Sequence, residues 1–125
     1  MSKVFFEQLG LPEPDIDLNV RSSSHGKQTA MIMIGVEEAI KKFNLSMVIA
    51  QGDTNTVLAA ALASVKMLIP FSHVEAGLRS WDRRMPEEVN RIIADIVAEL
   101  NFAPSYLAAV NLMHTGISLR KLRYR

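Results

Sequence analysis

The 125-residue sequence predicts an α/β protein with a doubly wound parallel sheet. Three observations support this fold class. Apolar residues recur at helical spacing in several segments, and short apolar runs bounded by Gly, Asn or Pro separate these segments. No internal repeat or Gly/Ser-rich linker divides the chain. We therefore expect one domain-sized unit whose parallel strands are joined by right-handed crossovers.

The first predicted elements are a short strand and a helix. Residues 16–20 alternate apolar and polar side chains, which is typical of a strand, and a polar loop follows at residues 21–26. Apolar residues then form one helical stripe, consisting of Ile32, Val36, Ala39, Ile40 and Phe43. We expect the helix to stop at Asn44.

Two buried runs flank the next predicted helix. Residues 45–50 are nearly all apolar, which predicts a strand covered on both faces. The alanine-rich residues 57–67 favour a helix, and three preceding residues can cap it, namely Thr54, Asn55 and Thr56. Residues 68–74 predict a second buried strand. We place Pro70 at its start, because proline lacks the N–H that a central strand uses.

A third helix and a last strand complete the pattern. Pro86 suits a first helical position, and acidic residues follow it in the first turn. The helix carries a stripe formed by Val89, Ile92, Ile93, Ile96, Val97 and Leu100. Residues 101–103 predict a short strand that ends at Pro104.

Polar segments are expected to meet at one edge of this sheet. Ligands of such sheets bind outside the carboxyl ends of the strands, where residues 21–26, 52–56 and 75–79 follow the first three strands. Asp53 and Glu75 should therefore emerge at the same edge. Glu87 points roughly 150° away from the apolar stripe of its helix, toward solvent or the crevice.

Asp53 and Glu75 also have structural explanations. Asp53 precedes capping residues and suits an Asx turn or a cap. Glu75 directly follows a buried run, where a carboxylate needs a partner or a function. Arg79 and Arg83 are its candidate ion-pair partners, and Gly77 permits a close backbone approach.

Three further ionisable residues are interpreted from their positions. Glu87 and Glu88 lie at a helix start and can pair with Arg91, and for Glu88 we favour this structural role. His73 lies in a buried strand, where a hydrogen-bonded core imidazole is the simpler expectation. The sequence has no GxGxxG after a strand, no Walker lysine and no GxSxG.

Composition excludes several other classes. The chain has no cysteine, and its three histidines are more than forty residues apart, so no metal motif exists. Its longest apolar runs, of about seven residues, are too short to span a membrane, and its start lacks the apolar core of a secretion signal. We expect a cytoplasmic protein. Residues 118–125 are basic, and we expect a frayed, solvated tail rather than a nucleic-acid site.

Four motifs, in this order and spacing, resemble those of the UDP-N-acetylglucosamine 2-epimerase family, in particular its archaeal-type members. They are QGDTNT at residues 51–56, PFSHVEAGLRS at 70–80, MPEEVNR at 85–91 and FAPS at 102–105. The similarity runs from about residue 1 to residue 117, and HVEAGLR followed by PEEVNR is its most specific part.

The resemblance implies a function. Members of this family have two Rossmann-like lobes of the GT-B type with a UDP-sugar between them. They eliminate UDP to leave a 2-acetamidoglucal and then add it back with C2 inverted, without a redox cofactor, which interconverts UDP-GlcNAc and UDP-ManNAc. The resemblance implies catalytic roles for Asp53, Glu75 and Glu87, and phosphate or carboxylate pairing for Arg79 and Arg91.

The chain lacks parts that the family has. The family's first strand and its Gly-Thr-Arg-Pro-Glu loop have no counterpart upstream of Met1, and the second lobe is missing. Residues 1–125 thus resemble part of an N-terminal lobe, which we expect to be inactive alone. A non-catalytic binding module and a glycosyltransferase-like lobe are the alternatives. We also expect a homo-oligomer, with edge strands near Ile16 and Asn101 available for pairing.

Overall fold

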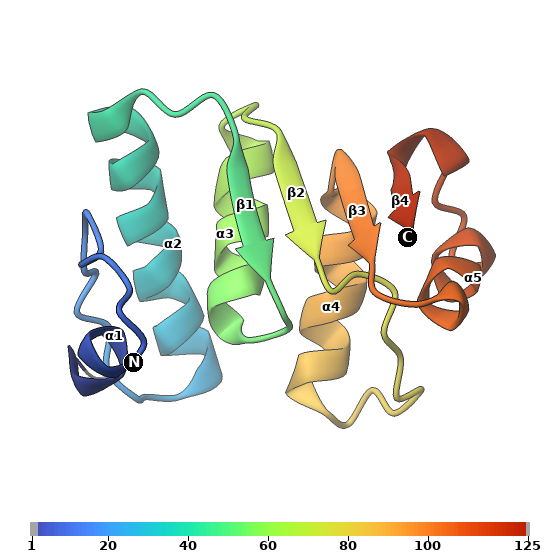
Figure 1. Ribbon diagram of the computed structural model, residues 1–125, viewed down its shortest axis with the longest axis horizontal. Helices are drawn as coiled ribbons and strands as arrows, with labels where there is room; N and C mark the ends of the chain where they lie inside the picture. Colours follow the sequence, from blue (N-terminus) through green and yellow to red (C-terminus); the bar gives the residue numbers. More distant parts are fainter. Residues whose placement is uncertain (1–2, 125) are drawn as a thin grey trace.

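The computed structural model describes residues 3–124 as a parallel sheet flanked by helices (Figure 1). All three strand pairs are parallel, and the sheet order is β1-β2-β3-β4. The parallel α/β architecture predicted from the sequence is confirmed. The elements in chain order are α1 (Lys3–Gln8), α2 (His25–Phe43), β1 (Val48–Gln51), α3 (Asn55–Lys66), β2 (Phe71–Val74), α4 (Pro86–Val97), β3 (Leu100–Ala103), α5 (Tyr106–His114), the 3-10 helix η1 (Leu119–Lys121) and β4 (Leu122–Tyr124).

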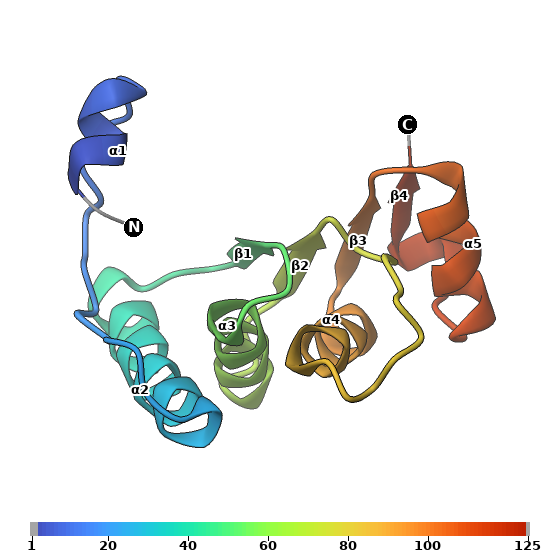
Figure 2. The same ribbon diagram turned by 90° about the horizontal axis from the view of Figure 1, so that it is seen from below.

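The helices α3 and α4 cover one face of the sheet (Figure 2). Because the strand order follows the chain order, every right-handed crossover places its helix on the same side. The opposite face is open in the described part of the chain, and α1 stands away from the sheet on that side. Ile49 on β1 is 64% exposed. The expectation that residues 45–50 are covered on both faces is therefore wrong.

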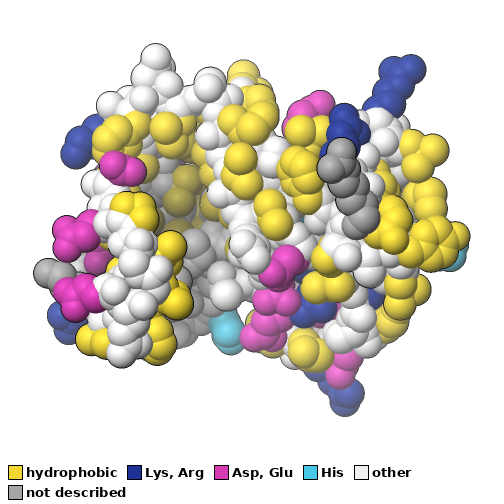
Figure 3. Space-filling model, viewed as in Figure 1, with side chains coloured by type: hydrophobic (Ala, Val, Ile, Leu, Met, Phe, Trp, Pro, Cys, Tyr) yellow, Lys and Arg dark blue, Asp and Glu magenta, His cyan; other side chains and the backbone are white. Residues whose placement is uncertain are grey.

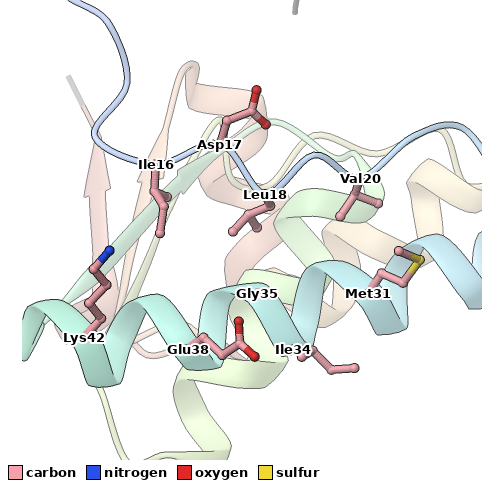
Figure 4. Close-up of a pocket in the computed structure, with 9 residues that line it drawn as sticks. All are labelled: Ile16, Asp17, Leu18, Val20, Met31, Ile34, Gly35, Glu38 and Lys42. Atoms are coloured by element: carbon pink, nitrogen blue, oxygen red, sulfur yellow. The ribbon is translucent and has the colours of Figure 1, made fainter.

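Residues 16–20 form no strand, contrary to the prediction from their alternating pattern. The segment runs along α2, with Ile16, Leu18 and Val20 turned toward the helix and Asp17 away from it (Figure 4). A Cβ added to Gly35 would come within 2.8 Å of the Leu18 side chain, so the contact is close. The alternation thus reflects packing on a helix. An open groove of about 460 Å³ lies between the two segments.

The predicted helices are confirmed, and the structure shows at which residues they begin and end. Ser24 caps α2 by accepting the Lys27 N–H at 3.4 Å, and Asn44 ends it in the left-handed conformation. Pro86 is at the start of α4. The second strand begins only at Phe71, after Pro70, as expected from the missing proline N–H.

Two apolar clusters form the core. One joins α3 and α4 to the sheet through Val57, Ala60, Ala61, Phe71, Ala94 and Ala98, and the other joins α5 to β3 and β4 through Ala76, Ala103, Ala108, Ala109 and Leu112. The apolar stripe of α4 lies largely outside both clusters. Val89 is 38% and Ile96 53% exposed, whereas Glu88 and Asp95 are buried. The buried face of α4 is therefore partly polar.

The C-terminal residues 118–124 are ordered, so the expectation of a frayed tail is wrong for them. Ser118 caps η1, and β4 pairs with β3 in parallel. The sheet edges are consequently β1 and β4, and Asn101 lies in the interior strand β3 rather than at an edge. Neither α1 nor α5 was evident from the sequence pattern. No helix in residues 3–124 is long and apolar enough to cross a membrane.

Candidate functional site

Polar loops meet where β1 and β2 end and α4 begins. We call this region the acidic edge and define it as residues 51–55, 75–79 and 86–91. Gln51 is in register with Val74 in the parallel pair, so Asp53 and Glu75 emerge at the same edge, as predicted. Figure 3 shows Asp and Glu side chains gathered at this end of the strands.

Arg91 holds Asp53 in an ion pair. Its Nη2 donates to Asp53 Oδ2 at 2.6 Å, and the two side chains are 12% and 34% exposed respectively. Its Nε donates to the main-chain oxygen of Glu87 at 3.3 Å. Thr54, not Asp53, occupies the N-cap position of α3. The interpretation of Asp53 as a simple helix cap is therefore wrong, and its carboxylate reaches the surface beside α4.

Glu75 has left-handed backbone angles, with φ at 69°. For a residue with a Cβ this conformation costs about 1–2 kcal/mol. Gln51 Nε2 donates to Glu75 Oε1 at 2.6 Å, and a Cβ built on Gly52 would lie 3.8 Å from Oε2. Arg79, one of its expected partners, pairs with Asp95 instead. Strained residues of this kind cluster at functional sites, which supports a functional interpretation of Glu75.

The neighbouring acids Glu87 and Glu88 have opposite environments. Glu88 is buried and accepts the N–H groups of Ser80 at 3.0 Å and Trp81 at 3.1 Å, and Arg91 lies 3.5 Å away. Burial alone would raise the pKa of Glu88, but these hydrogen bonds and the Arg91 charge outweigh it and hold the pKa below its ordinary value. Glu87 is exposed. The structural role expected for Glu88 is confirmed.

A buried charged cluster lies beneath the acidic edge. His73 Nδ1 is 2.6 Å from Asp95 Oδ1, and His73 Nε2 is 2.7 Å from the main-chain oxygen of Gly52. Asp95 Oδ2 accepts the Gly77 N–H at 3.1 Å and Arg79 Nη1 at 2.7 Å. The expectation of a hydrogen-bonded core imidazole at His73 is confirmed. Asp95 of α4 thus holds the loop at residues 75–79 directly, and it is connected to the Gly52 carbonyl through His73.

The two candidate arginines, Arg79 and Arg91, differ in burial and therefore in the partners that they can contact. The side chain of Arg79 is 1% exposed and is committed to Asp95, so its pairing is with a carboxylate inside the protein. This position argues against the direct substrate contact that we expected of Arg79. Arg91 is 12% exposed and reaches the surface between Asp53 and Glu88, where a ligand could contact it.

Side-chain amides connect the start of α2 to the acidic edge. Asn90 Nδ2 donates to the main-chain oxygen of Asp53 at 2.9 Å and to Asn55 Oδ1 at 3.2 Å. Asn55 Nδ2 then donates to Gln28 Oε1 at 2.8 Å and lies 3.0 Å from His25 Nδ1. The start of α2 therefore adjoins residues 52–56 through Asn55, although the strand expected before residues 21–26 is not formed.

Sequence reasoning missed the residues that organise this edge. Asp95 lies seven residues after Glu88, which is two helical turns, so the two acids share one face of α4. That spacing was the available signal that the face is polar and buried. Asn55 and Asn90 carry no comparable signal, since their partners come from segments distant in the chain.

The edge presents side chains that can transfer protons. Carboxylates of different exposure lie at the same edge, and such differences in environment separate proton donors from acceptors. In the described residues no group of three or more His, Asp or Glu side chains could hold a metal ion. Arg91 is already paired with Asp53, so a diphosphate would need further cations from elsewhere.

Together, the parallel sheet and the polar edge at its carboxyl end define a Rossmann-like α/β lobe. The comparisons identify its family. The family model for UDP-N-acetylglucosamine 2-epimerase matches residues 1–123. The chain belongs to this family.

Three relatives show how similar the chain is to known members of this family. It is 50% identical to the UDP-N-acetylglucosamine 2-epimerase of Methanococcus maripaludis over 98% of this chain and 33% of that protein. It is 46% identical to the UDP-2,3-diacetamido-2,3-dideoxy-D-glucuronate 2-epimerase of Pseudomonas aeruginosa, over 93% of this chain and 33% of that protein. The crystal structure of the Methanocaldococcus jannaschii UDP-GlcNAc 2-epimerase in complex with UDP-GlcNAc and UDP superposes with a TM-score of 0.95 at 48% identity, covering 98% of this chain and 34% of that one.

The chain therefore spans about a third of the length of these relatives. The matched third holds all the residues of the acidic edge.

Proposed function

We propose that this chain carries the acid–base part of the active site of a UDP-N-acetylglucosamine 2-epimerase. The observation that carries the proposal is the placement of Asp53 and Glu75 at one edge, beside the first turn of α4 that bears Glu87, with Glu75 held in a strained backbone conformation. The relative from M. jannaschii, 48% identical, has been crystallised with UDP-GlcNAc and UDP. The substrate would be UDP-GlcNAc or UDP-ManNAc, and no redox cofactor takes part.

The reaction requires chemistry that these side chains can supply. A base removes the proton at C2 of the sugar while the bond from C1 to the UDP oxygen breaks, which yields 2-acetamidoglucal and UDP. UDP then adds back to C1 as a proton is delivered to the opposite face of C2. Carboxylates positioned within reach of C2 and of the departing phosphate can serve as base and acid. Asp53, Glu75 and Glu87 are our candidates, with Arg91 in a substrate-positioning role.

The distribution of charge suggests which end of the substrate lies here. The cations of the edge are committed to its own carboxylates, through the Arg91 pair with Asp53 and the Arg79 pair with Asp95. A surface of this kind suits the sugar ring better than the diphosphate. We infer that the parts of the enzyme outside this chain hold the UDP group, and that the chain alone does not turn over.

A graft tests this function. The matched third of the M. maripaludis epimerase is replaced by the present sequence, and formation of UDP-N-acetylmannosamine is followed in a coupled assay. Asp53→Asn, Glu75→Gln and Glu87→Gln should each lower turnover roughly 100-fold or more, the usual scale for positioned acids and bases. Lys66→Gln, an exposed change far from the edge, is the control. Full turnover in all three acid variants would reject the proposal.

The Pseudomonas relative favours a second candidate substrate, a UDP-2,3-diacetamido sugar acid. The same graft should be assayed with both UDP-sugars. If the graft prefers the sugar acid, that compound is the substrate, and the proposed elimination mechanism still applies. If the folded graft binds a UDP-sugar but turns over neither substrate, the chain is a binding module instead.

We further propose that the chain forms a homo-oligomer. The open sheet face exposes Ile49, and α2 and α4 expose Met31, Ile34 and Ile96 at 44%, 59% and 53%. Association with a second copy would cover these exposed apolar side chains. Light scattering at micromolar concentration should show a dimer or a larger assembly, whereas a monomer that binds no hydrophobic dye would reject this proposal.

The proposed substrate also suggests a cellular setting. We propose that the protein works in the cytoplasm, because a UDP-sugar is highly charged and crosses a membrane only with a carrier. Its product would supply cell-surface polysaccharide synthesis.

A further inference from the structure

The buried cluster beneath the acidic edge contains a histidine whose two ring nitrogens both face oxygen atoms. His73 is 0% exposed on β2, and Asp95, also 0% exposed, reaches it from α4. The imidazole Nδ1 is 2.6 Å from Asp95 Oδ1, and Nε2 is 2.7 Å from the main-chain oxygen of Gly52. These distances are short enough for charge-assisted hydrogen bonds.

Neither oxygen can donate a proton to the ring in this arrangement. The Gly52 carbonyl is only an acceptor, so Nε2 must carry a hydrogen. Asp95 Oδ2 accepts the Gly77 N–H and Arg79 Nη1, so Asp95 is the carboxylate of the buried ion pair with Arg79. Asp95 Oδ1 is therefore an acceptor too, and Nδ1 must also carry a hydrogen. A neutral imidazole has only one N–H.

We propose that His73 is a buried imidazolium and that, with Asp95, it acts as a positioning residue for the acids of the edge. Through Nε2 it fixes the carbonyl of Gly52, which directly precedes Asp53. Through Asp95 it is connected to Gly77, two residues beyond Glu75. The hydrogen-bonded pair of His73 and Asp95 thus holds the two loops that bear Asp53 and Glu75.

The backbone of these loops shows why such an anchor is needed. Gly52, Glu75 and Gly77 all have positive φ, at 90°, 69° and 82°. A strained residue such as Glu75 keeps this conformation only where the surrounding contacts determine it. The two hydrogen bonds of His73 and the Gly77 N–H bond to Asp95 bracket Glu75 on both sides. The positioning role rests on the proposed function of the acids, whereas the protonation and the anchoring stand independently.

The protonation is tested on the 125-residue chain itself. Long-range ¹H–¹⁵N correlation spectra of the ¹⁵N-labelled protein at pH 7.5 should show hydrogens on both ring nitrogens of His73. The exposed His114 serves as the reference ring in the same spectra. An unprotonated Nδ1 or Nε2 at His73 would overturn the proposal, and this result does not depend on any variant folding.

The anchoring is tested by amide hydrogen exchange in His73→Gln, with His114→Gln as the matched control. A glutamine cannot donate to Gly52 and Asp95 together. The N–H of Gly52 is bonded to Val74 and that of Gly77 to Asp95. Both should exchange at least tenfold faster in His73→Gln, while the Ile117 amide stays unchanged. Unchanged exchange at Gly52 and Gly77, or an equal increase throughout the chain, would overturn the positioning role.

The two failures can be told apart. If the grafted enzyme is inactive but His73 is doubly protonated and anchors both loops, the proposed function fails and the cluster stands. If the graft is active but His73 carries one ring proton, the function stands and the positioning proposal fails.

Discussion

Replacing Glu88 by glutamine removes one buried charge while nearly preserving the shape of the side chain. Both oxygens of Glu88 are in use, since they accept the N–H groups of Ser80 and Trp81 at 3.0 and 3.1 Å. A glutamine offers one oxygen and an NH₂ group, so one of these backbone donors would face another donor. Leaving a buried donor without an acceptor costs about 1–3 kcal/mol.

The lost charge adds to this cost. A hydrogen bond to a charged group contributes about 1.5–3 kcal/mol, compared with about 1 kcal/mol for a neutral one. Arg91, 3.5 Å from Glu88, also loses an opposite charge. We therefore expect Glu88→Gln to lower the free energy of unfolding by about 2–3 kcal/mol. For a domain of this size that corresponds to a fall in Tm of roughly 8–12 °C.

Urea titration followed by circular dichroism measures the change, and Glu87→Gln is the matched control. Glu87 is the adjacent residue, carries the same charge and is exposed, so its substitution should change stability by no more than about 0.5 kcal/mol. Equal effects of the two variants would refute the assignment of Glu88 as the structural acid.

The pH dependence gives a second test of the same reasoning. The pKa of Glu88 is lower in the folded chain than its ordinary value, so the carboxylate stabilises the fold above that ordinary pKa. This contribution is lost as the pH falls from the ordinary glutamate pKa through the lower folded-state pKa. Glu88→Gln should therefore lose less stability than the parent chain over this acid range, and an equally steep acid dependence would contradict the interpretation.

Three other substitutions probe the backbone and the open face. Gly77→Ala should destabilise by at least 2 kcal/mol more than Gly116→Ala in chemical denaturation, because a Cβ on Gly77 would meet the Ala108 oxygen at 2.2 Å whereas Gly116 has open space. Leu68→Gly should raise stability by about 0.5–1 kcal/mol in the same assay, since Leu68 is 90% exposed with φ at 60°. Ile49→Lys should reduce dye binding and assembly size in light scattering, because Ile49 lies on the open sheet face.

Local pattern predicted the elements whose partners are near in the chain. The stripe of α2, the proline start of α4 and the buried run of β2 depend on a few adjacent residues, and each was confirmed. Residues 16–20 show the limit of such patterns. Their alternation is the same whether the apolar side chains face a sheet or, as here, the surface of α2.

The sequence predicted where the candidate acids lie, but not the ion pairs and hydrogen bonds that hold them in place. Sheet topology placed Asp53 and Glu75 at one edge, because parallel strands end together. It could not show that Arg79 would pair with Asp95 rather than with Glu75. That choice depends on how the loop after β2 meets α4, which is decided by tertiary packing rather than by spacing along the chain.

The strand order has a consequence for how this chain folds. Each strand pairs with the next strand in the chain: Val48 is opposite Phe71, Ser72 is opposite Leu100, and Asn101 is opposite Leu122. Every pairing therefore closes a loop of fewer than thirty residues, and the entropy of loop closure rises only slowly with length. Such a sheet can grow one strand at a time as the chain leaves the ribosome, each new strand adding to a finished edge.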